Sequence, residues 1–154
     1  MKYLKLAIIS AIMIFLLFTV ISLFIPSQVN ISRAVNLSSK PENVLSRIKD
    51  TSTWNEWYPG FDTLLSSGTR IIISGSTDSS VTAEFSNDKA KKSITSTWQI
   101  MTYGQVDSVT LQWYMHFKLR WYPWEKFGSL LYERSYGQHM EKALGNLKNA
   151  LSEK

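Results

Sequence analysis

The chain has 154 residues and no cysteine, an absence that excludes disulfide bonds, thiol nucleophiles and cysteine-ligated zinc. Histidine is nearly as scarce. His116 and His139 are the two present, and their separation forms neither a His-x-His nor a His-Glu-x-x-His motif. We therefore expect no metal site and no cofactor.

Other motifs and charge are also sparse. The sequence has no Gly-x-Ser-x-Gly elbow and no glycine-rich phosphate loop, so hydrolase and nucleotide-binding functions lose their usual support. Charged residues make up 19% of the chain, with a net charge of +5. Lys2 and Lys5 contribute two of these charges, which leaves +3 on the rest, too little to indicate a nucleic-acid partner.

What the chain does have is one long apolar run. Leu6–Ile25 contains twenty consecutive residues without a charge, preceded by Lys2 and Lys5 and followed by Pro26. Twenty helical residues extend about 30 Å, the thickness of the hydrocarbon core of a bilayer. We predict that residues 1–25 form an N-terminal transmembrane anchor.

A cleaved signal peptide is the alternative, because it also combines a basic start with an apolar core. The run is long for a signal core, and no pair of small residues near Pro26 is spaced like an Ala-x-Ala cleavage site. The basic N-terminal flank favours a cytoplasmic N-terminus. We therefore expect a single-pass membrane protein whose domain lies outside the cytoplasm.

The remaining chain has the length of one domain, residues 29–154, joined to the anchor by the linker 26–28. Val29, Ile31, Val35 and Leu37 alternate with polar or small residues, which predicts a half-buried strand. Three linker residues span only about 10 Å when fully extended, so the domain must lie close to the bilayer.

Two capping-box patterns follow the first strand. Ser39–Glu42 places a proline in the first turn of a predicted helix. Thr53–Glu56 opens a short helical turn that carries Trp54 and Trp57, and Pro59-Gly60 is expected to end that turn. Two short helices are thus predicted here.

The second half of the chain combines strands with one long helix. Segments with period-two character predict an antiparallel meander over 69–74, 80–86, 92–101 and 108–121. In the last segment one face holds Val109, Leu111, Trp113, Met115, Phe117, Leu119 and Trp121, and we expect this face to be buried. Pro123 interrupts the pattern, and apolar residues at helical spacing predict a helix over 135–151.

Several of these residues carry a resemblance to a known superfamily. Arg33 on the first strand, Pro41-Glu42-Asn43-Val44, Trp54-Asn55-Glu56-Trp57-Tyr58-Pro59 and Leu144-Gly145-Asn146-Leu147-Lys148 resemble START-like (SRPBCC) proteins, in particular the polyketide cyclase/dehydrase-type branch. The likeness covers residues 29 to 151. The Trp-x-x-Trp-Tyr-Pro element is the more specific part of it.

The resemblance implies an α+β helix-grip fold, in which a curved antiparallel sheet wraps around the long C-terminal helix. It also implies a hydrophobic cavity between sheet and helix, which in relatives holds lipids, sterols, polyketides or other apolar molecules. Relatives include both binding proteins and enzymes, so the superfamily alone does not decide the function.

The candidate ligand-binding residues are Arg33, Trp57, Phe85, Trp98, Trp113, Met115, Phe117 and His139. Arg33 shares the parity of the apolar residues of its strand, so its charge needs an inward partner. That partner is either an acidic side chain or the polar headgroup of a ligand. The tryptophans are either ordinary core or the lining of a cavity, and His139 lies at the edge of the apolar stripe of its helix.

Three functions remain open at this stage. The favoured one is membrane-anchored binding of a hydrophobic small molecule or lipid without covalent chemistry. A cyclase- or hydrolase-like enzyme on the same fold would need an ionisable group in the cavity, and the candidates are Arg33, His139, Tyr103 and Tyr136. An interaction domain with a filled core would show tight packing of the tryptophans.

Overall fold

The computed structural model describes residues 2–87, 92–102 and 108–152. The elements follow in the order α1 (Lys2–Leu23), β1 (Gln28–Leu37), α2 (Pro41–Lys49), the 3-10 turn η1 (Thr51–Thr53), α3 (Trp54–Trp57), α4 (Phe61–Ser66), β2 (Thr69–Ser76), β3 (Ser80–Asn87), β4 (Lys92–Thr102), β5 (Val109–Lys118), α5 (Pro123–Ser129) and α6 (Tyr132–Ser152). This order confirms the predicted α+β class.

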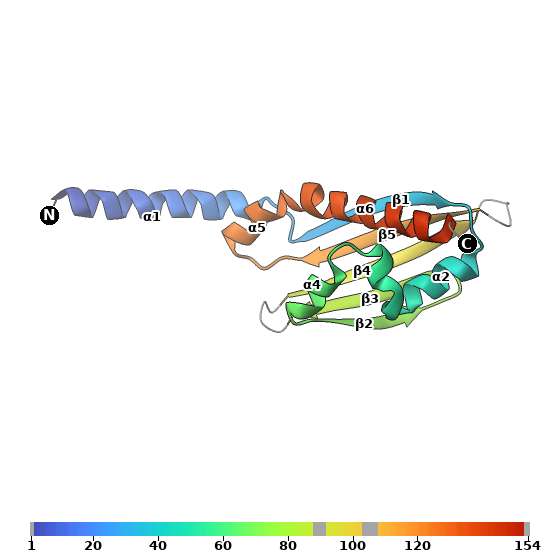
Figure 1. Ribbon diagram of the computed structural model, residues 1–154. Helices are drawn as coiled ribbons and strands as arrows, with labels where there is room; N and C mark the ends of the chain where they lie inside the picture. The colour runs from blue at the N-terminus through green and yellow to red at the C-terminus, as the bar shows by residue number, and fades with distance from the viewer. Residues whose placement is uncertain (1, 88–91, 103–107, 153–154) are drawn as a thin grey trace.

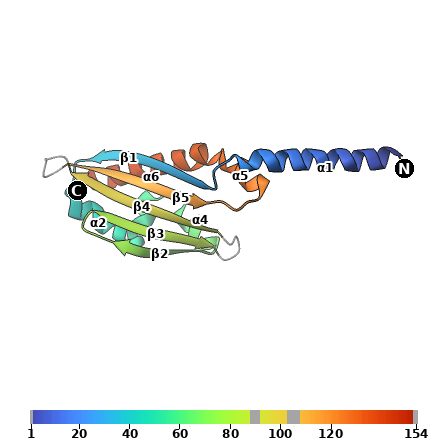
Figure 2. The same ribbon diagram turned by 180° about the vertical axis from the view of Figure 1, so that it is seen from behind.

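The five strands form one antiparallel sheet in the order β1-β5-β4-β3-β2. The long helix α6 lies along one face of the sheet and contacts β1, while α2, α3 and α4 cover the part of that face formed by β2 and β3 (Figure 1). The opposite face carries no helix in the view from behind (Figure 2). This is the predicted helix-grip arrangement.

Strand β5 has the predicted parity along its length. Val109, Leu111, Trp113, Met115 and Phe117 are all buried, and the residues between them face outward. The strand ends at Lys118, however, and the backbone N–H of Leu119 donates to the carbonyl oxygen of Ser27 at 2.9 Å.

The prediction that Trp121 shares the buried face was therefore wrong. Its side chain is 66% exposed, because the strand pattern no longer applies once the chain turns toward α5.

Neither predicted capping box forms. Lys40 is the N-cap of α2 and makes no side-chain cap, and the helix begins instead with Pro41, which lacks the N–H that would otherwise be left unbonded. The Thr53 hydroxyl donates to the carbonyl oxygens of Arg47 and Asp50, at 3.0 and 2.9 Å, and so does not cap α3. The carboxylate of Asp50 accepts from the backbone N–H of Ser52 at 3.0 Å.

Two short helices were not predicted. As predicted, the helical turn α3 ends before Pro59-Gly60, at Trp57, but Gly60 adopts the left-handed conformation, with φ of 70°, and is the N-cap of a further helix, α4. Pro123 likewise opens α5 rather than only interrupting a strand. Helix α6 then begins at Tyr132, three residues before the predicted start at 135.

Arg33 joins β1 to α6 through two acidic side chains. Its Nη2 lies 2.8 Å from Oε1 of Glu133, and its Nε lies 2.6 Å from Oε1 of Glu141. These hydrogen bonds raise the pKa of Arg33 above its ordinary value. Of the two partners considered for Arg33, an acidic side chain or a ligand headgroup, the structure shows acidic side chains.

Gly137 makes this contact possible. It lies between the two glutamates on α6, and a Cβ atom at this position would be 2.3 Å from Nη2 of Arg33. The guanidinium group therefore occupies the space that a side chain would fill. Gly145, on the same helix, has nothing within 4 Å of its Cβ position.

We expect Gly145→Ala to raise the free energy of unfolding by up to about 1 kcal/mol, because alanine favours helix more than glycine does. Gly137→Ala should lack this gain, since the new methyl group displaces Arg33 from its ion pairs. In an Arg33→Ala background the gain at 137 should return. Urea unfolding of the full-length protein in detergent measures these values, and equal effects at 137 in both backgrounds would contradict the packing described.

Candidate functional site

The interior beside α3 is filled by aromatic rings. Trp54, Trp57, Trp98 and Trp113 are fully buried. The rings of Trp54 and Trp98 lie 5.3 Å apart in a T-shaped contact, and those of Trp98 and Trp113 lie 5.1 Å apart and stacked. Tyr58 stacks against Trp54 at 5.7 Å. The tryptophans predicted from the sequence thus pack on one another.

Several polar atoms in this interior have no hydrogen-bond partner within the described residues: Nε1 of Trp57, Trp98 and Trp113, and Oγ of Ser96. Nε1 of Trp54, in contrast, donates to the carbonyl oxygen of Ile48 at 2.9 Å. An unpaired buried donor costs about 1–3 kcal/mol, so native proteins usually pair such groups. These four residues are fully buried, and none of them lines either of the pockets described below.

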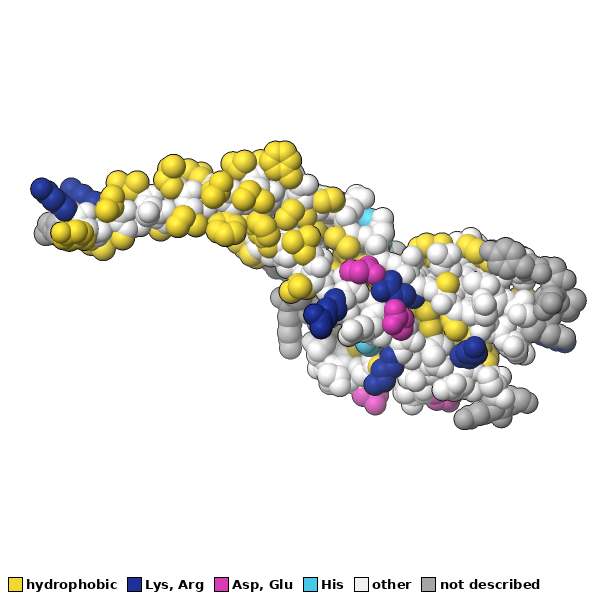
Figure 3. All heavy atoms as spheres, turned by 90° about the horizontal axis from the view of Figure 1, so that it is seen from above, with side chains coloured by type: hydrophobic (Ala, Val, Ile, Leu, Met, Phe, Trp, Pro, Cys, Tyr) yellow, Lys and Arg dark blue, Asp and Glu magenta, His cyan; other side chains and the backbone are white. Residues whose placement is uncertain are grey.

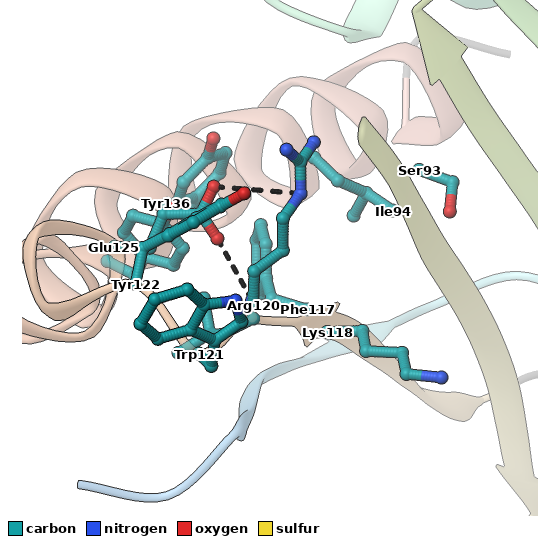
Figure 4. A pocket seen from close by; sticks show the side chains of 11 residues that line it. Ser93, Ile94, Phe117, Lys118, Arg120, Trp121, Tyr122, Glu125 and Tyr136 are labelled. Atoms are coloured by element: carbon teal, nitrogen blue, oxygen red, sulfur yellow. Dashed lines mark hydrogen bonds and ion pairs between the residues drawn. The ribbon is translucent and has the colours of Figure 1, made fainter. Parts of the chain in front are cut away.

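An aromatic-lined pocket of about 510 Å³ opens where β4, β5, α5 and α6 meet. Its lining consists of Ser93, Ile94, Phe117, Lys118, Leu119, Arg120, Trp121, Tyr122, Glu125, Tyr132 and Tyr136 (Figure 4). The Phe117 ring lies 5.1 Å from that of Tyr132 and 4.6 Å from that of Tyr136. We call this the α5 pocket.

Two charged side chains of the α5 pocket, Glu125 and Arg120, contact each other. Oε2 of Glu125 accepts from the backbone N–H of Arg120 at 2.9 Å, and its Oε1 lies 3.9 Å from Nε of Arg120 (Figure 4). These contacts tie the segment after β5 to α5. The remaining surface for a guest molecule is therefore mainly aromatic and aliphatic.

A second pocket, of about 530 Å³, lies between α3, α4 and α6. Its lining consists of Tyr58, Pro59, Gly60, Thr63, Leu64, Ser67, Ser135, Tyr136 and His139. We call it the His139 pocket. Tyr136 lines both pockets, so one side chain of α6 separates them.

His139 is half-buried and packs edge-on against the Tyr58 ring at 5.0 Å. Burial lowers the pKa of His139, and the nearby charge of Lys142 lowers it further. Burial also raises the pKa values of Tyr58 and Tyr136. Near neutral pH the pocket therefore holds a neutral imidazole and protonated phenols, groups able to exchange hydrogen bonds or accept a proton.

The eight predicted site residues do not come together in one cavity. Phe117 lines the α5 pocket and His139 lines the other. Five of the remaining six are buried core residues: Trp57, Phe85, Trp98, Trp113 and Met115. Arg33 is held by Glu133 and Glu141. Tyr103, considered for acid-base chemistry, lies outside the described residues.

Sequence reasoning missed most of the pocket lining. Tyr136, considered for acid-base chemistry, and Trp121, expected in the core, line this pocket together with Tyr122 and Tyr132, for which the sequence predicted no role. The i, i+4 spacing of Tyr132 and Tyr136 was a usable signal. Within the described ranges, no three His, Asp or Glu side chains lie close enough to hold a metal ion.

Helix α5, which contributes Glu125 to the α5 pocket, contacts the end of α1. The Phe18 and Phe127 rings meet edge-to-face at 5.6 Å, and α1 is the one described helix long and apolar enough to cross a membrane. The buried Lys126 donates through Nζ to the carbonyl oxygen of Ile25 at 2.6 Å and to Oγ of Ser27 at 2.9 Å. Helix α1 is otherwise exposed along its length, so it is not a core helix of the domain.

Known structures share this fold. A START superfamily protein from Mycobacterium smegmatis aligns with a TM-score of 0.57 and 12% identity over 80% of this chain and 97% of its own. The di-domain ARO/CYC StfQ from the steffimycin biosynthetic pathway aligns with a TM-score of 0.59 and 7% identity over 82% of this chain and 52% of its own. The Aha1 dimer from Colwellia psychrerythraea gives 0.53, at 12% identity over 80% and 96%.

No protein-family model and no curated protein sequence matches the chain. At these identities the structural likeness concerns the fold, and the fold is that of START-like proteins and of ARO/CYC cyclases.

We expect Trp54→Phe to lower the free energy of unfolding more than Trp98→Phe does. Both substitutions remove the same volume from fully buried sites, but the first also leaves the Ile48 carbonyl without its donor, whereas the second removes a donor that has no partner. The difference should be about 1–3 kcal/mol. Urea unfolding measures it, and a larger loss for Trp98→Phe would mean that the Trp98 indole is hydrogen-bonded in solution.

His139 should make stability depend on pH. Its pKa in the folded protein lies below the ordinary 6.5, so the unfolded chain takes up this proton first as the pH falls. The free energy of unfolding should therefore decrease as the pH is lowered from 7 through the folded-state pKa. His139→Gln should flatten this part of the curve. Parallel curves for the wild type and this variant would contradict the assignment.

Proposed function

We propose that this chain is a single-pass membrane-anchored protein that binds a hydrophobic small molecule or lipid in the α5 pocket. The observation that carries this proposal is an aromatic-lined pocket on a START-like fold, bordered by α5, which contacts a helix apolar enough to cross a membrane. A ligand leaving the bilayer would reach such a pocket by a short path.

The size and lining of the pocket support an apolar ligand. Its volume of about 510 Å³ falls within the roughly 300–1,000 Å³ typical of small-molecule sites. Ile94, Phe117 and Leu119 supply aliphatic and aromatic surface, while the Tyr132 and Tyr136 side chains add phenol groups. The ligand class that fits is a molecule with an apolar body and at least one hydrogen-bonding group.

The fold supports the same ligand class. Solved structures with this fold include a START superfamily protein and di-domain ARO/CYC proteins, and the resemblance to START-like proteins implies a hydrophobic ligand. The likeness favours a hydrophobic-ligand fold without separating binding from catalysis.

The contacts between α1 and α5 support a retained anchor over a cleaved signal peptide. A helix that is removed gains nothing from an aromatic contact with Phe127 or from the bond of the buried Lys126 to Ile25, just beyond its end. We propose residues 1–25 as anchor, 26–28 as linker and 29–154 as the binding domain. The basic residues Lys2 and Lys5 favour a cytoplasmic N-terminus and an extracytoplasmic domain.

An enzyme on the same fold is the second candidate, and the His139 pocket is the observation that favours it. The pocket of about 530 Å³ brings a neutral imidazole next to Tyr58 and Tyr136. An imidazole whose pKa lies below its ordinary value is suited to act as a general base at neutral pH. A substrate would have to enter between α4 and α6.

Native mass spectrometry of the gently purified full-length protein tests the binding proposal. We expect one apolar molecule per chain in the wild type and none on the isolated anchor. Tyr132→Ala should weaken binding of the fluorescent fatty acid cis-parinaric acid about tenfold, equivalent to about 1.4 kcal/mol, because the aromatic wall is lost.

Tyr114→Ala is the matched control, because this tyrosine lies on the outward face of β5 and should leave binding unchanged. A protein that is always empty and does not bind the probe would contradict the proposal. Recovery of two molecules related by a covalent change would favour the enzyme instead.

A further inference from the structure

Large exposed apolar side chains of the domain gather at one place. Among the described residues from 28 to 152, six such side chains are exposed, and four of them lie between 121 and 131. These four, which are 63–68% exposed, are Trp121, Trp124, Leu130 and Leu131. We call this surface the α5 platform.

The platform is held together by ring contacts. Tyr122 stacks on Trp124 with centroids 4.9 Å apart and an interplanar angle of 7°, and it also contacts Trp121 at 4.9 Å. Leu130 and Leu131 follow at the turn from α5 to α6. An ordered, exposed aromatic surface of this kind is unusual on a domain surrounded by water.

The position of α5 relative to α1 sets the depth of the platform. Phe127 of α5 contacts Phe18, which lies five residues before the end of α1. At 1.5 Å per residue this contact is about 7.5 Å inside the helix end. Lys126 is bound at the same time to the carbonyl oxygen of Ile25, so α5 runs alongside the last turns of α1.

This depth matches the edge of a bilayer. The 22 residues of α1 extend about 33 Å, barely more than a hydrocarbon core of about 30 Å. If α1 covers the hydrocarbon core, Phe18 must lie at the boundary of that core or just inside it. Because Phe127 contacts Phe18, α5 lies at the same depth in the bilayer. Hydrophobic side chains cover α1 and continue onto the adjoining end of the domain (Figure 3).

We propose that the α5 platform is a second membrane contact, which inserts into the interface of the bilayer that α1 spans. The occupant of this face is lipid, at the boundary between headgroups and acyl chains, where tryptophan and tyrosine are favoured. The inference rests on the proposed anchoring by α1. Trp121 and Tyr122 also line the α5 pocket, so insertion of the platform would place the opening of this pocket next to the lipid.

Spin labels on single cysteines test this directly, because the natural chain contains no cysteine. The variants are Trp124→Cys and Leu131→Cys on the platform, Ile12→Cys within α1, and Ile72→Cys as an exposed apolar control on β2. Each full-length protein is reconstituted at about one chain per vesicle in phosphatidylcholine with phosphatidylglycerol. Circular dichroism confirms that each variant is folded.

The measurement is the ratio of collision rates with oxygen, which concentrates in lipid, and with a water-soluble nickel chelate. We expect ratios at 124 and 131 at least fivefold above that at 72 and approaching that at 12. A lipid-like ratio at 12 with aqueous values at 124 and 131 would overturn the platform and leave the anchor intact.

Two other outcomes also overturn the inference. Low collision rates with both reagents at 124 and 131 would mean that protein covers this face. An aqueous ratio at 12 would show that α1 is not inserted, and the proposed anchoring would then fail together with the platform. Binding of apolar ligands could still hold in that case, so the two failures are distinguishable.

Discussion

Burial of one face of α6 against the inward face of the sheet is the interaction on which the rest of this domain depends. Met140, Ala143, Leu144 and Leu147 recur at helical spacing and are almost completely buried. Below them, inward residues of adjacent strands form a continuous apolar layer, and each fully buried large side chain contributes about 1.5–3 kcal/mol. Arg33 adds ion pairs between β1 and α6, because its guanidinium group lies over Gly137 and contacts Glu133 and Glu141.

The two pockets follow from the same packing. Tyr132 and Tyr136 lie in the first turns of α6, at the edge of the aromatic core. Tyr132 lines the α5 pocket, and Tyr136 lines both pockets. Deeper in the domain the tryptophans fill the interior, which resembles the filled-core alternative more than a wide cavity. The α5 pocket therefore lies at the end of the domain where α5 contacts α1.

Sequence periodicity predicted the parts that depend on local pattern. The alternation from Val109 to Leu119 matched the buried face of β5, and the stripe in α6 matched its core side. It failed at Trp121, because the pairing of β5 with β1 does not extend beyond Leu119, which still bonds to Ser27, and the chain then turns toward α5. The capping boxes failed for a related reason: Thr53 finds carbonyl acceptors on the preceding segment, which no local pattern records.

The spacing of neighbouring residues was enough to predict an apolar helix of membrane-spanning length, an antiparallel meander and a long amphipathic helix, because each of these has its own local pattern. Which side chains border a pocket and which are core depends instead on how the elements pack. Phe117 and Trp113 share one face of one strand, yet Phe117 lines the α5 pocket, whereas Trp113 is fully buried against Trp98. That difference arises from elements distant in the chain, since the position of α5 and α6 over each residue decides what lies above it.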